Sequence, residues 1–205
     1  MRSWLLTPAL FAITLAACQY EPGVGPAERV IAVDPAHRQE IEEWQARRTR
    51  SLTSETGWLT LTGLSWLQPG QNTIGSAEGS DIPLPASTAA SVGTILLDGD
   101  SMTLRAAPEA GVTVNGEPVR NVVMKPDVSG EPTIAEIGSV QFYTIERGGK
   151  LGVRVRDRQH PARTTFEGLE YFPTNPEWRV EARLEPYDPP KQIPILNIIG
   201  IVAPQ

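Results

Sequence analysis

The chain has 205 residues, a formal net charge of -6, 40% hydrophobic residues and 20% charged residues. This composition is typical of a soluble globular protein and argues against long disorder or a polytopic membrane protein. The acidic balance provides no general attraction to nucleic acid, so we expect no nucleic-acid partner. The single cysteine excludes an intrachain disulfide.

The first 17 residues have the features of a signal peptide. Met1 and Arg2 form a short basic start, and Trp4 to Ala17 is an uncharged stretch. That stretch is shorter than the roughly 20 apolar residues that a membrane-spanning helix needs, and it fits the apolar region of a signal peptide.

The end of this stretch resembles a bacterial lipobox, which consists here of Leu15, Ala16, Ala17 and Cys18. The resemblance implies that Cys18 is acylated and becomes the mature N-terminus. The alternative is an ordinary secretory signal whose only cysteine falls at this position by chance. Gln19 follows in place of the aspartate that resembles an inner-membrane retention signal. We therefore expect a lipoprotein of the bacterial cell envelope, anchored in the outer membrane and facing the periplasm.

A flexible tether and one helix are expected next. Residues 18–33 are rich in proline and glycine and have few apolar residues, which is typical of a linker. Asp34 followed by Pro35 is a typical helix start, and the helix should run to about Leu52. We assign residues 34–205 to a single, mainly β domain.

From Gly57 onward the pattern is that of short strands separated by turn residues. Strands are expected at about 58–64, 81–84, 94–97, 102–104, 112–114, 119–124, 133–137, 140–145 and 151–155. Several short strands at regular spacing predict a β-sandwich or a partly open barrel, here with one N-terminal helix. The large aromatic residues Trp58, Trp66 and Trp178 are expected in the core rather than on a glycan-binding surface.

Cationic residues concentrate in one predicted hairpin. Gly148 and Gly149 separate two strand-like runs, which predicts a two-residue turn and pairs residue i with residue 297 - i. Because side chains alternate along a strand, one face then carries Gln141, Tyr143, Ile145, Arg147, Lys150, Arg154 and Arg156. The opposite face, with Phe142, Val153 and Val155, should pack into the core. Asp157 shares the parity of the core face, and His160 follows in the exit loop.

Three interpretations of this face stay open. The first is a solvated surface on which the aliphatic parts of the arginine side chains cover apolar area. The second is a binding site for an anionic or polar ligand, with the guanidinium groups as hydrogen-bond donors. The third is the site of a hydrolase-type envelope enzyme. The candidate site residues are Tyr143, Arg147, Arg154, Arg156, Asp157 and His160. The chain has only two histidines, and we expect neither a metal site nor a cofactor. We favour a ligand- or partner-binding module over the enzyme, and structural scaffolding is a further alternative.

Three blocks of the sequence together resemble domain-of-unknown-function family 1684, which is bacterial and often found on lipoproteins. They are Gly57-Trp58-Leu59 with the segment 64–85, Val112 to Gly116, and Ile145 to Pro173 with its Gly152-x-Arg154-x-Arg156-Asp157 motif. The resemblance covers about Ala36 to the C-terminus and implies no particular activity. Full-length members continue past this point, so the chain is expected to be a truncated or short variant. The apolar run Ile193 to Val202 should then be a strand with an unpaired edge.

The first half also resembles a forkhead-associated β-sandwich. Ile74-Gly75-Ser76, Asp81-Ile82-x-Leu84 and Val114-Asn115-Gly116 occur in a similar order. The resemblance implies a fold that recognises phosphothreonine through an arginine, but Ser76 stands at that position here. We therefore expect the shape without the phosphothreonine activity, and Asn115-Gly116 to form a type I′ hairpin turn.

Overall fold

The computed structural model describes residues 32–191, 193–196 and 202–204 of the chain. The predicted signal peptide, the lipobox Leu15–Cys18 and nearly all of the predicted tether lie outside the described residues. The described part contains no helix that is long and apolar enough to cross a membrane.

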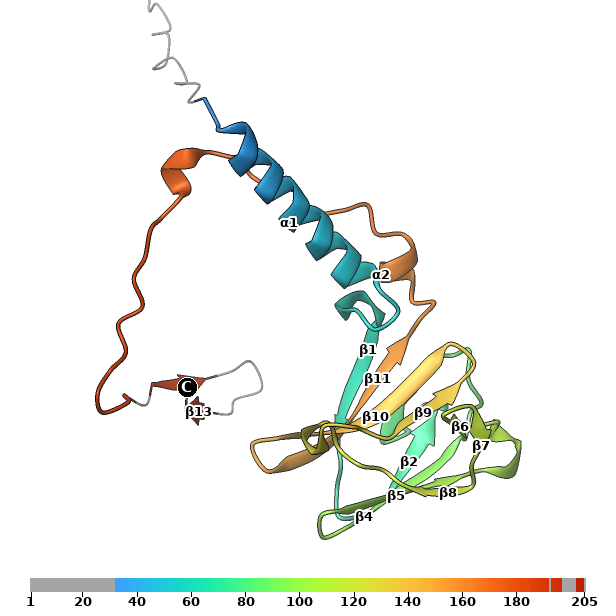
Figure 1. Ribbon diagram of the computed structural model, residues 1–205. Coiled ribbons are helices and arrows are strands. Elements are labelled where there is room, and N and C mark those ends of the chain that lie inside the picture. The colour runs from blue at the N-terminus through green and yellow to red at the C-terminus, as the bar shows by residue number, and fades with distance from the viewer. Residues whose placement is uncertain (1–31, 192, 197–201, 205) are drawn as a thin grey trace, which may run out of the picture. The chain divides into compact units, whose positions relative to one another are not determined.

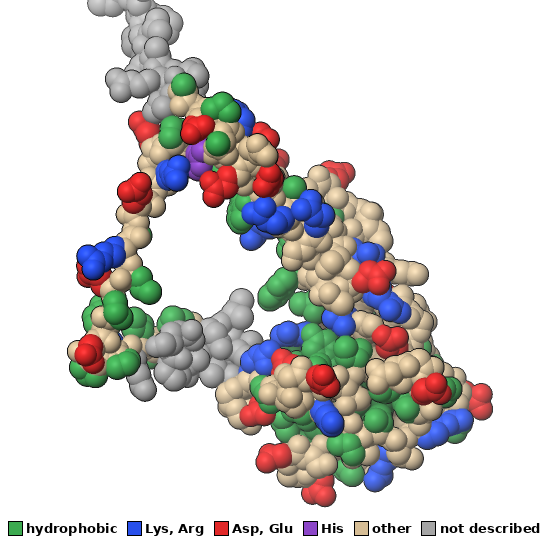
Figure 2. Space-filling model, in the orientation of Figure 1, with side chains coloured by type: hydrophobic (Ala, Val, Ile, Leu, Met, Phe, Trp, Pro, Cys, Tyr) green, Lys and Arg blue, Asp and Glu red, His purple; other side chains and the backbone are tan. Residues whose placement is uncertain are grey.

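Helix α1 (Pro35–Thr53) begins where the sequence predicts. The side chain of Asp34 accepts a 2.9 Å hydrogen bond from the Ala36 amide, and Pro35 is the first helical residue, where its missing N–H costs nothing. No residue of α1 is buried. Basic side chains gather on its second half (Figure 2), where they complement the negative end of the helix dipole.

One sheet has six strands in the order β1-β11-β10-β9-β6-β7. The strands are β1 (Leu61–Trp66), β6 (Thr113–Val114), β7 (Glu117–Pro118), β9 (Ile134–Ile137), β10 (Val140–Arg147) and β11 (Lys150–Asp157). All neighbours in this sheet are antiparallel.

The other large sheet has five strands in the order β3-β2-β4-β5-β8, and β2 and β3 form its parallel pair. The strands are β2 (Gly70–Gly75), β3 (Ile82–Pro83), β4 (Gly93–Asp98), β5 (Ser101–Ala106) and β8 (Asn121–Val123).

The two sheets enclose one hydrophobic core (Figure 1). The five-stranded sheet contributes Ile74, Ile95 and Leu104, and the six-stranded sheet contributes Phe142 and Val153, all at most 1% exposed. The fold is therefore mainly β, a sandwich with one N-terminal helix, as the sequence predicts.

The two predicted hairpin turns are confirmed. Asn115 and Gly116, between β6 and β7, both have positive φ, at 52° and 80°. Gly148 and Gly149, between β10 and β11, have φ of 57° and 72°. Positive φ at both central residues is the requirement of a type I′ turn, and it explains the choice of glycine and asparagine.

The chain after β11 contains little regular structure. The short helix α2 (Pro161–Thr164) follows at once, and the 3₁₀ turn η4 spans Pro176–Trp178. Instead of one strand over Ile193 to Val202, the described residues form two short paired strands, β12 (Pro194–Leu196) and β13 (Val202–Pro204). The expectation of a single strand was wrong, because the two ends of the apolar run pair with each other.

The expectation that the three large aromatic residues lie in the core was also wrong. Trp58 is 73% exposed and Trp178 is 61% exposed, while Trp66 is half-buried. Trp58 lies in the 3₁₀ turn η1 (Trp58–Thr60) and Trp178 in η4, so both fall outside the strands that build the core. The core is filled by aliphatic side chains and Phe142 instead.

Candidate ligand-binding face

The register of the β10–β11 hairpin is the predicted one. Gln141 pairs with Arg156, Tyr143 with Arg154, and Arg147 with Lys150. These side chains therefore share the face of the six-stranded sheet that points away from the core, which we call the outer face.

The outer face is more buried than a solvated hairpin would be. The core face is as predicted, with Phe142 and Val153 fully buried. On the outer face, however, Gln141 is 6% exposed, Ile145 is fully buried and Arg156 is 9% exposed. The 3₁₀ turn η3 (Asp127–Ser129) contacts β10, while Arg147 and Arg154 of the outer face are half-buried and Lys150 is exposed.

Arg147 is held by a carboxylate from η3. Its guanidinium donates to Asp127 Oδ1 at 3.0 Å and to Asp127 Oδ2 at 2.6 Å, and the Glu146 amide donates to Oδ1 at 3.2 Å. Burial raises the pKa of Asp127, but the hydrogen bonds from Arg147 and the Glu146 amide and the charges of Arg147 and Arg154 outweigh it, so that the pKa lies below its ordinary value. The hydrogen bond to Asp127 raises the pKa of Arg147.

Arg156 is held by a chain of polar groups. Its Nε donates to Gln141 Oε1 at 2.5 Å, and Gln141 Nε2 donates in turn to Glu136 of β9. The Arg156 guanidinium also lies over the ring of Tyr143, 5.3 Å from its centroid, in a cation–π arrangement. Glu136 is 4.0 Å from Arg158 as well, so this carboxylate faces two arginines.

Arg154 lies between these two held arginines and is itself unpaired. Arg154 as a residue is half-buried, and its guanidinium has neither a hydrogen bond nor an ion pair within the described part of the chain. Leu64 of β1 and Tyr143 of β10 lie opposite it in the sheet. Its charge contributes to the lowered pKa of Asp127, which shows that it acts on the same part of the face.

The remaining two candidates have local structural roles. Asp157 Oδ1 accepts a 2.9 Å hydrogen bond from the Gln159 amide, which stabilises the turn after β11. His160 Nδ1 accepts a 3.3 Å hydrogen bond from the Ala162 amide and caps α2. Neither side chain has a polar contact with an arginine of the outer face among the described residues. The structure thus groups Tyr143, Arg147, Arg154 and Arg156 but leaves Asp157 and His160 apart from them.

Sequence reasoning missed two residues that shape this face. Glu136 could have been found once β9 was paired with β10, because it lies opposite Gln141. Asp127 comes from a turn outside the hairpin, and no local pattern in the sequence indicates that it reaches Arg147.

Three of the cavities bounded by described residues include none of Tyr143, Arg147, Arg154 and Arg156 in their lining. The largest, of about 620 Å³, lies against the second half of α1 and includes Trp44, Arg48 and Trp58. A cavity of about 460 Å³ lies at the turns that include Gln68, Asp100 and Lys150. A cavity of about 370 Å³ lies between α1 and the segment 171–179. Over the described residues, no group of three histidine, cysteine, aspartate or glutamate side chains could hold a metal ion.

No protein-family model matches the chain, and no curated protein matches it. Membership of family 1684 therefore stays a resemblance in the motifs quoted above.

Solved structures of forkhead-associated (FHA) domains match part of the chain. The FHA domain of FhaA, complexed with the intracellular domain of Rv3910, is 19% identical, with 96% of its length and 44% of this chain covered and a TM-score of 0.31. A structure from an analysis of phosphothreonine-dependent FHA domain interactions is 20% identical, with 95% and 48% covered and a TM-score of 0.32. The Rv0020c FHA structure is 19% identical, with 94% and 46% covered and a TM-score of 0.31. Because these TM-scores and identities are low, we base the assignment of a β-sandwich on the two sheets of the chain and not on these matches.

Proposed function

We propose that the chain is a lipid-anchored binding module of the bacterial cell envelope, and that its outer face binds an anionic ligand through Arg154. The observation that carries this proposal is the contrast between Arg154 and its neighbours. Arg147 and Arg156 are each held by a described partner, whereas Arg154 is half-buried and has none.

The chemistry of the face suits an anion. A guanidinium presents a planar fork of donors that matches a carboxylate or a phosphate. Lys150 and the three arginines of the hairpin face two carboxylates, those of Asp127 and Glu136, so positive charge is in excess. Like charges on neighbouring positions of a sheet are destabilising, and a bound anion would offset this cost.

The surroundings of Arg154 also support a binding role. Tyr143 is fixed by the Arg156 guanidinium over its ring, and it lies next to Arg154 in the sheet. A rigid aromatic neighbour and two immobilised arginines reduce the entropy lost when a ligand binds. By contrast, Asp157 stabilises the turn after β11 and His160 caps α2, and among the described residues neither has a polar contact with an arginine of the outer face.

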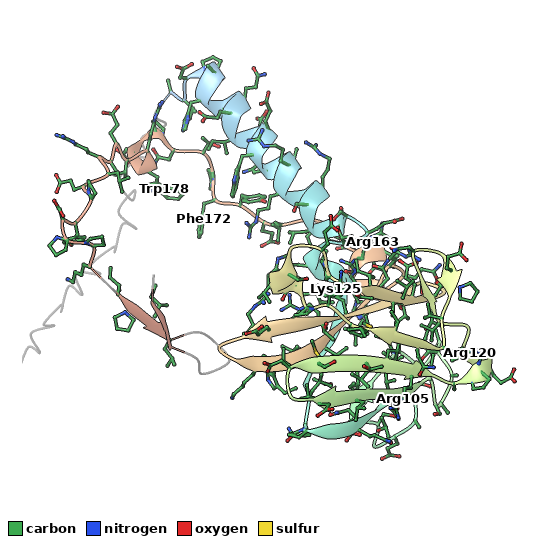
Figure 3. All side chains as sticks on the ribbon, turned by 60° about the horizontal axis from the view of Figure 1, so that its bottom comes forward. Arg105, Arg120, Lys125, Arg163, Phe172 and Trp178 are labelled. Atoms are coloured by element: carbon green, nitrogen blue, oxygen red, sulfur yellow. The ribbon has the colours of Figure 1, made fainter. Side chains whose placement is uncertain are left out.

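The ligand proposal is tested by thermal unfolding with citrate or phosphate. A ligand at one hundred times its dissociation constant stabilises a fold by about 2.7 kcal/mol, and we expect an upward shift of the melting temperature beyond that of chloride at equal ionic strength. Arg154→Ala should abolish this shift. The matched control is Arg105→Ala on β5 (Figure 3), because Arg105 is an exposed strand arginine whose side chain has no hydrogen bond or ion pair to a described residue. Equal shifts in chloride, or equal loss in both variants, would contradict the proposal.

The anchor is tested at Cys18. The lipobox of Leu15, Ala16, Ala17 and Cys18 supports acylation, and two or more acyl chains are needed for stable anchoring. Cys18→Ser should leave the precursor unprocessed by the lipoprotein peptidase or release a soluble protein. Normal processing and membrane retention of the variant would exclude a lipid anchor at this residue.

A further inference from the structure

The cavity between α1 and the segment 171–179 has mainly aromatic walls. Its volume of about 370 Å³ lies within the range of roughly 300–1,000 Å³ that is common for small-molecule sites. Four rings line it: Trp44 from α1, and Tyr171, Phe172 and Trp178 from the segment that follows α2. We call these four residues the aromatic cage.

The rings of the aromatic cage meet edge to face. Trp44 and Tyr171 have ring centroids 5.8 Å apart with their planes at 68°, and Phe172 and Trp178 have centroids 5.7 Å apart with planes at 82°. In each pair the edge of one ring contacts the face of the other, so the ring planes that line the cavity are not parallel. Figure 3 shows Phe172 and Trp178 close together on the segment after α2.

These rings are exposed in a way that the fold does not require. Phe172 is 81% exposed and Trp178 is 61% exposed, and none of the four rings belongs to the sandwich core. Large apolar groups that are exposed together mark a binding surface more often than isolated ones do. Since ring faces carry a negative quadrupole, an aromatic enclosure favours a cation, above all a quaternary ammonium group.

The polar groups of the cavity are cationic or neutral rather than acidic. Arg179 lines it, and so does His37, whose Nδ1 is buried without a hydrogen bond to any described residue and lies 3.7 Å from Glu40. A bare cation would be repelled by Arg179. A bare anion would gain nothing from the rings.

We propose that the aromatic cage binds a zwitterionic ligand of the phosphocholine type. The quaternary ammonium group lies against the rings, and the phosphate accepts hydrogen bonds from Arg179 and His37. This site is separate from the outer face of the six-stranded sheet, and the inference does not depend on the anion site at Arg154.

The first experiment is calorimetric titration of the full chain, solubilised in a maltoside detergent, with three ligands. Phosphocholine tests the whole zwitterion and choline tests the cation alone. 3,3-Dimethylbutan-1-ol replaces the charged nitrogen of choline by carbon at nearly constant shape. We expect phosphocholine to bind more tightly than choline and the neutral analogue to bind at least about fivefold more weakly than choline, because it lacks the cation–π attraction. No binding of phosphocholine, or equal binding of choline and its neutral analogue, would overturn the proposal.

Variants locate the site. Trp178→Ala should weaken choline and phosphocholine binding about fivefold or more, and Trp178→Phe should retain most of it, because a ring face remains. Trp58→Ala is the matched control: Trp58 is equally large and exposed but does not line this cavity. Arg179→Gln should reduce the advantage of phosphocholine over choline, because it removes a donor to the phosphate and relieves the repulsion of the choline cation. Losses of equal size in Trp58→Ala and Trp178→Ala would contradict the assignment.

Competition with vesicles distinguishes a soluble ligand from a lipid headgroup. If the headgroup is accessible, phosphatidylcholine vesicles displace bound phosphocholine from the full chain and phosphatidylethanolamine vesicles do not. If only the soluble compound enters the cage, neither kind of vesicle competes. Displacement by both kinds to the same extent would overturn the proposed recognition of the quaternary ammonium group.

Discussion

Arg147 binds both carboxylate oxygens of Asp127, at 3.0 Å and 2.6 Å, and so joins the end of β10 to the 3₁₀ turn η3. The same carboxylate accepts a hydrogen bond from the Glu146 amide. The pair fixes one arginine of the outer face and holds the pKa of Asp127 below its ordinary value of 3.8, because the hydrogen bonds and positive charges outweigh the effect of burial. The carboxylate of Asp127 bound to Arg147 is also an example of the anionic group that a ligand would present to Arg154.

The first prediction concerns the pH dependence of this pair. A carboxyl group whose pKa is lowered in the folded state contributes stability above its unfolded pKa, and this contribution is lost as the pH falls through the folded pKa. We expect Asp127→Asn to lower the free energy of unfolding by about 0.5–1 kcal/mol at pH 7, a modest value because both side chains are partly exposed. At an acidic pH below the lowered pKa of the folded state the difference from the parent chain should disappear, because the parent Asp127 is then protonated as well.

Urea unfolding at the two pH values measures this effect. Asp100→Asn is the control, because Asp100 is exposed and its side chain has no hydrogen bond to a described residue. A difference between Asp127→Asn and the parent chain that is the same at both pH values would show that the carboxylate charge does not stabilise the fold.

The second prediction concerns the end of α1. Arg163 of α2 donates from Nε to the Thr53 carbonyl at 2.8 Å and from Nη1 to the Arg158 carbonyl at 2.7 Å. A cation at a helix C-terminus satisfies an unpaired carbonyl and complements the dipole. Arg163→Gln should therefore speed amide hydrogen exchange in the last turn of α1 and leave β10 and β11 unchanged. Arg120→Gln, which replaces an exposed arginine without such a contact, should leave α1 as it is (Figure 3). Unchanged exchange in α1 would refute this role of Arg163.

The sequence predicts well those elements that are determined by residues close together in the chain. The β10–β11 register follows from alternation and from two glycines that accept positive φ, and α1 starts at a cap that is visible in two residues. Strand β2 was missed because most of its residues are polar. Its Asn72 is 2% exposed and donates to the carbonyls of Gln68 and Ile95, at 2.8 Å and 3.2 Å, so tertiary hydrogen bonds stabilise a strand that its composition does not indicate.

The candidate site divides in the same way. The shared face of Tyr143, Arg154 and Arg156 follows from the hairpin register alone. The partners that hold Arg147 and Arg156 come from η3 and β9, which no local pattern connects to the hairpin. The turn hydrogen bond of Asp157 and the helix cap of His160 could not be predicted either, because the same residue types serve in turns, in caps and in catalysis.

The third prediction compares two glycines. A Cβ at Gly75 would lie 2.2 Å from the Ala90 carbonyl oxygen, which is backbone and cannot move aside easily, while a Cβ at Gly63 would meet nothing within 4 Å. Gly75→Ala should therefore destabilise the sandwich by about 1–3 kcal/mol, the usual cost of overpacking. Gly63→Ala should change the free energy of unfolding by less than about 0.5 kcal/mol. Denaturant unfolding of both variants tests this, and equal effects would refute the close approach of β2 to residue 90.

The fourth prediction concerns phosphothreonine peptides. Ser76 stands where the forkhead-associated fold that the sequence resembles keeps an arginine, and its hydroxyl is already engaged, donating to the Thr88 carbonyl at 2.9 Å. Without bidentate, charge-assisted donors at this position, the hydrogen bonds to a phosphate would not offset the free-energy cost of removing its water. We expect no phosphate-dependent binding of micromolar affinity, about -8 kcal/mol, at the loop that contains Ser76.

Paired arrays of phosphorylated and unphosphorylated threonine peptides measure this binding, and Arg154→Ala separates the two possible sites. Phosphate-dependent binding that disappears in Arg154→Ala belongs to the outer face of the six-stranded sheet and agrees with the proposed anion site. Micromolar binding that persists in Arg154→Ala but is lost in Ser76→Ala would contradict the prediction, because it would place the phosphate at the loop that lacks an arginine. The Ser76 hydroxyl would then have to exchange its bond to Thr88 for one to the ligand.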